Sequence, residues 1–148
     1  MRLAHTYCSK SINTFAPFIP LIHPQQRFGN AITSTGVLNL RHASYSSDFS
    51  AVEPNCKCTI CRPVSAGGLG LTRAYIHHVA AKETAGAHLL SIHNVHYLLD
   101  LMRRIREAII ADTYPQFLRE YFSTLYAGDK TKYPTWIVDA LKLSLIHI

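Results

Sequence analysis

Three closely spaced cysteines constrain the fold of this chain more than any other feature. They form a Cys-x-Cys-x-x-Cys pattern at Cys56, Cys58 and Cys61. Thiolate and imidazole are the usual ligands of structural zinc, which binds four of them in a tetrahedron. One tight turn directs the sulfurs of Cys58 and Cys61 to the same point, and in an extended segment Cys56 points to the same side as Cys58. The pattern predicts a zinc site with three thiolate ligands.

The alternatives to zinc are a disulfide or a loop with three free thiols. A disulfide would leave an odd thiol in the cluster, and Cys-x-Cys is an awkward pair to bridge. A zinc ion needs a fourth ligand from outside the loop, and five downstream histidines are candidates: His77, His78, His88, His93 and His96. Adjacent residues on a helix point about 100° apart, so at most one of His77 and His78 faces the metal. Spacing alone does not choose among the five.

Length and charge set broader limits on the protein. With 148 residues the chain is long enough for one domain with a small core. Its net charge of +6 suits a polyanionic partner such as RNA, with a solvated basic surface as the alternative. Clustered cysteines fit a reducing compartment, and no apolar run approaches the roughly 20 residues that span a bilayer. We expect a cytoplasmic protein, or one associated with mitochondria.

The chain downstream of residue 26 predicts a short β hairpin followed by helices. Residues 31–33 and 37–40 are β-prone runs that flank a turn, and residues 62–71 form a flexible glycine-rich loop. Thr72 is a plausible N-cap, and helical patterns continue from it to residue 143. One apolar stripe recurs at helical spacing and predicts a core-facing helix: Val95, Leu98, Leu99, Met102, Ile105 and Ile109.

Two details of these helices are also predicted. Arg106 projects near the middle of the apolar stripe, so a buried ion pair is expected there. Pro115 begins the next helix, and Pro134 opens a last short one. The helix that begins at Pro115 buries the following residues: Phe117, Leu118, Tyr121, Phe122 and Leu125.

Several short segments together resemble one enzyme family. They are residues 56–61, 73–78, 88–94, 101–106, 133–136 and 139–141. In this order they are similar to the zinc subdomain of the tRNA-guanine transglycosylases, most closely the catalytic subunit of the eukaryotic queuine tRNA-ribosyltransferases. The resemblance implies a mainly α fold with a short β hairpin: the zinc-stapled helical C-terminal subdomain of a (β/α)8 TIM-barrel enzyme, with the barrel largely absent. Three segments follow from it: a non-family N-terminal segment (1–26), the zinc subdomain (27–142) and an adapter-derived tail (143–148).

The resemblance also implies a site and a function. The fourth zinc ligand is the histidine of the His-Asn pair, His93, and Arg27 ends a tRNA-contacting segment. The family exchanges the wobble guanine of certain tRNAs for a deazaguanine, queuine in eukaryotes, through attack by an aspartate on the ribose. The implied partners are tRNA, queuine and either a related non-catalytic subunit or a second copy.

The region before Arg27 departs from the family pattern. The family has its nucleophilic aspartate shortly before an Arg-Phe-Gly segment, yet here no aspartate or glutamate precedes Asp48. Covalent ribosyl chemistry needs a positioned carboxylate, so we expect this chain alone to be inactive. Residues 1–26 are either a transit peptide or a misassigned start, and residues 62–71 are either an insertion or a splicing error. A non-catalytic zinc-binding helical module for RNA or a protein partner is the alternative function.

Overall fold

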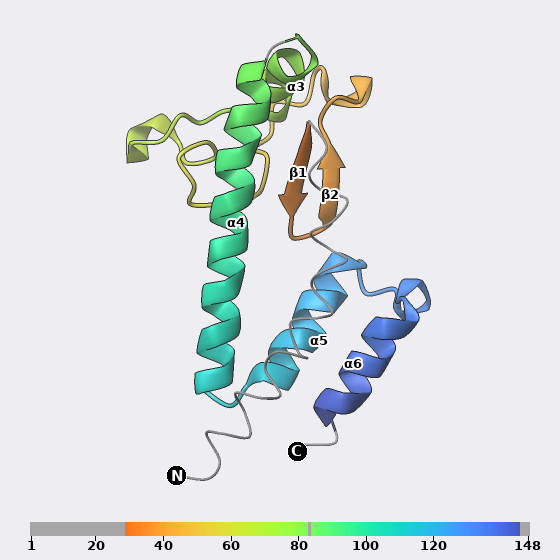
Figure 1. Ribbon diagram of the computed structural model, residues 1–148. Coiled ribbons are helices and arrows are strands. Elements are labelled where there is room, and N and C mark those ends of the chain that lie inside the picture. Colours follow the sequence, from red (N-terminus) through yellow and green to blue (C-terminus); the bar gives the residue numbers. More distant parts are fainter. Residues whose placement is uncertain (1–28, 83, 146–148) are drawn as a thin grey trace.

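The protein is mainly helical, with one antiparallel hairpin beside a long helix (Figure 1). A computed structural model describes residues 29–82 and 84–145. The elements in chain order are β1 (Asn30–Thr33), β2 (Gly36–Asn39), η3 (Ala43–Tyr45), η4 (Val64–Ala66), α3 (Arg73–Lys82), α4 (Thr84–Ile110), α5 (Tyr114–Leu125), η5 (Lys130–Lys132) and α6 (Thr135–Leu145). The predicted helical class with a short hairpin is therefore confirmed. Within the described ranges the sheet has two strands, so the barrel implied by the resemblance is not represented there.

The hairpin forms where the sequence predicts it. Thr33 pairs with Gly36 at the closed end, which leaves Ser34 and Thr35 as a two-residue turn. Gly36 has φ of 117°, a conformation that glycine adopts without a steric penalty. The Thr33 hydroxyl donates to the Gly36 carbonyl at 2.7 Å and fastens the turn.

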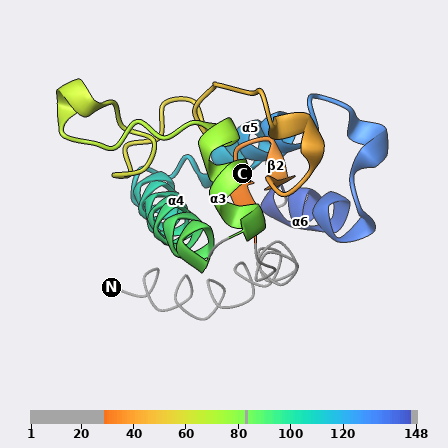
Figure 2. The same ribbon diagram turned by 90° about the horizontal axis from the view of Figure 1, so that it is seen from above.

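Helices α3 and α4 meet in a tight corner at the top of the molecule in Figure 1. The Thr72 hydroxyl accepts from the Tyr75 amide at 3.2 Å, which confirms Thr72 as the N-cap of α3. A Cβ added to Gly86 would lie 2.5 Å from the Ala80 nitrogen, so the close approach of the two helices requires glycine there. Helix α4 then runs past the hairpin to α5 and α6 (Figures 1 and 2).

The predicted apolar stripe of α4 is only partly correct. Its inner face carries five buried hydrophobic residues: Leu90, Tyr97, Leu101, Ile105 and Ala108. Three other members of the predicted stripe pack against the core from the sides: Leu98, Met102 and Ile109. Val95 and Leu99, however, are 57% and 66% exposed. The helix therefore has apolar side chains on its outer face as well.

The buried ion pair predicted for Arg106 is wrong, because this side chain is exposed. Eleven residues separate Arg106 from Val95, which places the two within about 20° of each other around the helix. The projection was correct, but Val95 belongs to the outer face. Arg106 therefore needs no buried partner.

Two hydrophobic cores lie on opposite sides of β1. The first, which we call the cysteine core, consists of small and aliphatic side chains: Ala31, Leu40, Val52, Cys58, Ile60, Cys61, Ile76 and Leu90. The second, the aromatic core, joins α4, α5 and α6: Ile32, Tyr97, Leu101, Ile105, Leu118, Tyr121, Phe122 and Ile137. Successive side chains of a strand point to opposite faces, so Ala31 enters one core and Ile32 the other. β1 is the seam between them.

The glycine content of residues 62–71 predicted a flexible loop. In the structure this loop is held by backbone hydrogen bonds. The amides of Leu69 and Leu71 donate to the carbonyls of Thr59 and Ile60, at 2.7 and 2.9 Å. The loop therefore pairs with the cysteine segment that precedes it, while the side chain of Val64 near its tip is 73% exposed.

Some predictions lie outside the part of the chain that the structure describes. These are the predictions for residues 1–26 and Arg27, and for residues 146–148 of the predicted tail. The first three residues of that tail, 143–145, belong to α6. Among the described residues, no helix is both long enough and apolar enough to cross a membrane.

Candidate metal centre

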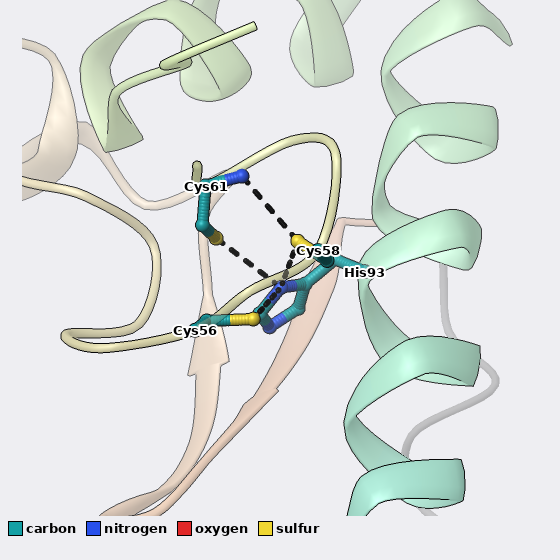
Figure 3. A group of neighbouring side chains, drawn as sticks. All are labelled: Cys56, Cys58, Cys61 and His93. Atoms are coloured by element: carbon teal, nitrogen blue, oxygen red, sulfur yellow. Dashed lines mark hydrogen bonds between the residues drawn. The ribbon is translucent and has the colours of Figure 1, made fainter. Parts of the chain in front are cut away.

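The structure brings together the four predicted zinc ligands. Cys56, Cys58 and Cys61 lie on the loop that follows β2, and His93 reaches them from the middle of α4 (Figure 3). The four ligand atoms all lie within 4.8 Å of one another. Cys58 and His93 are almost fully buried, with 2% and 0% of their surface exposed. Among the described residues this is the only such group of His, Cys, Asp and Glu side chains.

The spacing of the ligand atoms fits a tetrahedral metal ion. The His93 Nδ1 atom lies 3.8, 3.5 and 3.4 Å from the sulfurs of Cys56, Cys58 and Cys61. Bond lengths of about 2.3 Å to sulfur and about 2.0–2.1 Å to nitrogen give tetrahedral S···N edges of about 3.6 Å. A single ring nitrogen cannot make three good hydrogen bonds at once, whereas the corner of a coordination tetrahedron has three such neighbours.

The tautomer of His93 suits metal binding. Its Nε2 atom lies 2.9 Å from the Ile32 carbonyl oxygen. A carbonyl oxygen only accepts hydrogen bonds, so Nε2 carries the proton and donates it. The lone pair of Nδ1 therefore points toward the three sulfurs. In metal sites a ligand histidine regularly donates its other ring N–H to a backbone carbonyl, which fixes the tautomer and the orientation of the ring.

The cysteines show why a cation is favoured here. A hydrogen bond from the Cys61 thiol, the largest cause, lowers the pKa of Cys56 to about 3. The same hydrogen bond and burial raise the pKa of Cys61, and burial raises that of Cys58. Three thiolates held this close together are therefore unfavourable without a compensating positive charge. A divalent cation would compensate the charge of all three thiolates and release the remaining protons.

The other candidate histidines do not join the cluster. His77 lies on α3, where its Nδ1 atom donates to the Leu40 carbonyl at 2.8 Å. His78 and His88 are exposed, and His96 is half-buried on α4. The residues alone left the choice among five histidines open, and the geometry brings only His93 to the sulfurs.

Sequence reasoning missed the contribution of the residues around the ligands. The side chain of Asn94 hydrogen-bonds the backbone of β1 on both sides of Ala31. Glu53 is 8% exposed and accepts from the Ser34 amide at 3.2 Å, which ties the hairpin turn to the segment before the cysteines. A polar residue directly after a ligand histidine was the available signal for Asn94, whereas Glu53 had none.

Comparison with known proteins places the chain in a family. The family model described as queuine tRNA-ribosyltransferase matches residues 20–127. The chain belongs to the queuine tRNA-ribosyltransferase family. This family assignment agrees with the resemblance in the cysteine segment and the His-Asn pair.

Individual relatives show how much of the family's length is covered. The catalytic subunit of queuine tRNA-ribosyltransferase from Schizosaccharomyces pombe is 48% identical over 122 residues, which are 82% of this chain and 30% of that protein. The catalytic subunit from Caenorhabditis briggsae is 38% identical over 74% of this chain and 26% of its own length. A queuine tRNA-ribosyltransferase from Lactiplantibacillus plantarum is 39% identical over 70% and 26%. The chain thus spans less than a third of the length of these relatives.

Proposed function

We propose that Cys56, Cys58, Cys61 and His93 bind one structural zinc ion. The spacing of the Nδ1 atom and the three sulfurs supports this, because thiolate and imidazole in a tetrahedron are the typical ligands of zinc. Four protein ligands leave no coordination position for a water molecule or substrate, which is the mark of a structural site. Elemental analysis of the purified chain should give one zinc per molecule, and substitution of Cys58 should abolish it. A protein that holds iron or no metal would contradict the assignment.

We propose further that the chain supplies the zinc-binding helical part of an enzyme that exchanges wobble guanine in tRNA for queuine. The match of residues 20–127 to the family carries this proposal. The zinc fastens the cysteine loop to α4 and so gives that part a fixed shape. Binding of tRNA, with Arg27 at the contact, and pairing with a related non-catalytic subunit or a second copy belong to the same proposal.

The two acidic residues nearest to Arg27 along the chain support the expectation that this chain alone is inactive. Asp48, the first acidic residue, binds Arg73 at 3.1 Å and accepts from Ser50. Glu53 is buried and bound to the hairpin turn. Both carboxylates are engaged within the fold, which supports our proposal that the nucleophile of the complete enzyme lies in another segment.

The outer face of α4 supports assembly with such a segment. Four apolar residues are exposed along this helix: Ile92, Val95, Leu99 and Ile110. Exposed apolar residues aligned on one face are typical of a contact surface. We assign this face to the contact with the barrel of the complete enzyme.

A chimera tests the proposed function. Residues 29–142 replace the matching segment of the Schizosaccharomyces pombe relative, and incorporation of labelled queuine into tRNA is measured. We expect exchange by the chimera, and its loss in a matched chimera with Cys58→Ser. The chain alone should show none. A chimera that folds and binds zinc but cannot exchange the base would contradict the proposal, as would exchange by the chain alone.

A stand-alone RNA-binding module is the second candidate function, and the charge distribution favours it. Arg41, Lys57 and Arg62 are exposed cations on the hairpin and cysteine loop, and the whole chain carries +6. Binding of tRNA by the chain alone, weakening steeply with salt, combined with an inactive chimera would favour the module over the enzyme part.

A further inference from the structure

The side chain of Asn94 takes the place of a neighbouring strand along β1. Its Oδ1 atom accepts from the Ile32 amide at 2.9 Å, and its Nδ2 atom donates to the Asn30 carbonyl at 3.0 Å. Gly29 and Leu40 are hydrogen-bonded across the hairpin, and alternate residues of an antiparallel strand face the same partner. The polar backbone groups of Asn30 and Ile32 therefore face away from β2, toward α4.

The metal ligand His93 uses the same outward edge. Its Nε2–H donates to the Ile32 carbonyl at 2.9 Å. The amide and the carbonyl of Ile32 are thus held by consecutive residues of α4, one by Asn94 and the other by His93. The carbonyl that selects the tautomer of the metal ligand belongs to the residue that Asn94 fixes.

We propose that Asn94 is a positioning residue of the metal centre. Its amide holds Ile32 so that the Ile32 carbonyl keeps the His93 ring in the tautomer and rotation that present Nδ1 to the three sulfurs. Loss of the Asn94 amide leaves this carbonyl free to turn, and the imidazole loses its fixed direction. Outer contacts of this kind change metal affinity by about 10–100-fold when they are removed.

The proposed role of Asn94 is more than that of a general anchor for the hairpin. His77 is a suitable control, because it also hydrogen-bonds the hairpin segment. His77 also fastens the hairpin to a helix through one carbonyl, that of Leu40 at 2.8 Å. It belongs to α3, its side chain hydrogen-bonds Leu40 rather than Ile32, and it is not a member of the four-residue ligand cluster. A variant at His77 therefore loosens the hairpin without acting on the orientation of His93.

The first measurement is the Zn²⁺ affinity of the full chain, obtained by competition with a chelator. The second is the visible absorption spectrum of the Co²⁺-loaded protein. We expect Asn94→Leu to weaken Zn²⁺ binding about 10–100-fold and to shift the Co²⁺ absorption bands. We expect His77→Ala to weaken binding less than about 3-fold and to leave the bands in place, because the His93 ring keeps its carbonyl.

Asn94→Asp keeps the overall shape and the oxygen acceptor for the Ile32 amide, so it should bind Zn²⁺ more tightly than Asn94→Leu and less tightly than the wild type. Should Asn94→Leu fail to fold, Asn94→Asp decides the matter by its affinity and bands. The role of Asn94 would be overturned if its folded variants kept the wild-type Zn²⁺ affinity and Co²⁺ bands. It would also be overturned if His77→Ala lost as much Zn²⁺ affinity as the Asn94 variants. The inference rests on the proposed metal site, and failure of the wild type to bind Zn²⁺ would overturn that site itself.

Discussion

The two hydrophobic cores of this protein contain different kinds of side chain. The cysteine core holds small and aliphatic side chains around the candidate metal centre. The aromatic core holds Tyr97, Tyr121 and Phe122 and is lined by further rings, with Trp136 edge-on to Phe122 at 6.0 Å between centroids. Aromatic side chains bury about 150–250 Å² each, so three of them supply a large hydrophobic stabilisation. The buried members of the cysteine core include no aromatic ring, and Tyr45 packs against this core while only partly buried.

The proposed zinc ion would explain how the smaller core is held together. Structural zinc binding has an apparent free energy of about 10–16 kcal/mol at neutral pH. One buried large side chain contributes about 1.5–3 kcal/mol. The proposed metal centre would therefore outweigh several core side chains, and it would join segments as distant in sequence as Cys58 and His93. One metal cross-link would thus replace hydrophobic area in the core where the chain supplies less of it.

The largest expected effect comes from loss of a ligand. Cys58→Ala removes a buried sulfur from the centre, so we expect loss of bound zinc and a destabilisation greater than the roughly 2–5 kcal/mol of a single core truncation. Metal analysis and thermal unfolding measure both quantities. Replacement of the exposed Lys57 in the same loop is the control and should change neither. Full zinc content in Cys58→Ala would contradict the proposed ligand set.

A truncation in the aromatic core should act on stability alone. Phe122 is 1% exposed and touches both Tyr121 and Trp136. Phe122→Ala should lower the free energy of unfolding by about 3–5 kcal/mol while zinc content stays at one per chain. Denaturant titration and metal analysis check the two parts. Loss of zinc from the folded variant would show that the cores are not separable.

A smaller change in the cysteine core probes its packing without touching the metal. Ile76 on α3 is fully buried, and Ile76→Val removes one methylene group. We expect a loss of about 0.5–1.5 kcal/mol in denaturant titration. The same change at the exposed Ile92 should be close to neutral. A cost at Ile76 equal to that of Cys58→Ala would argue against the metal as the dominant stabiliser.

The smallest expected effect is electrostatic. Hydrogen bonds from Ser50, and then the Arg73 guanidinium, lower the pKa of the Asp48 carboxyl. Its stabilising contribution is therefore present above the unfolded pKa of about 3.9 and is lost as pH falls through the lower folded value. Asp48→Asn should be slightly less stable than the wild type from pH 7 to pH 5, and the difference should shrink below about pH 4. Thermal unfolding of both proteins across this range checks the sign; a difference that grows in acid would contradict it.

The sequence predicted local features well, but it did not predict which face of α4 is buried. The hairpin, the cap at Thr72 and the approach of three cysteines follow from turn chemistry and short spacings. Apolar residues such as Val95 and Leu99 occur on the outer face of α4, and periodicity does not tell an inner stripe from an outer one. That ambiguity placed Arg106 in the core incorrectly.

The choice of His93 was beyond local reasoning for a similar reason. Which histidine meets the sulfurs depends on where α4 crosses the cysteine loop, and this crossing is set by packing between distant segments. The resemblance in the His-Asn pair supplied the answer that spacing left open. The contacts of Asn94 with β1 depend on the same crossing, whereas the contact of Glu53 depends on how the hairpin turn packs against the segment before the cysteines.

The most direct test of the account is hydrogen exchange, followed segment by segment, in the metal-loaded protein and after complete removal of metal by a chelator at neutral pH. We expect residues 30–82 to lose most of their protection and residues 114–137 to keep theirs, because only the first group depends on the proposed metal centre. Unchanged protection in residues 30–82 would contradict it, and so would an equal loss along the whole described chain.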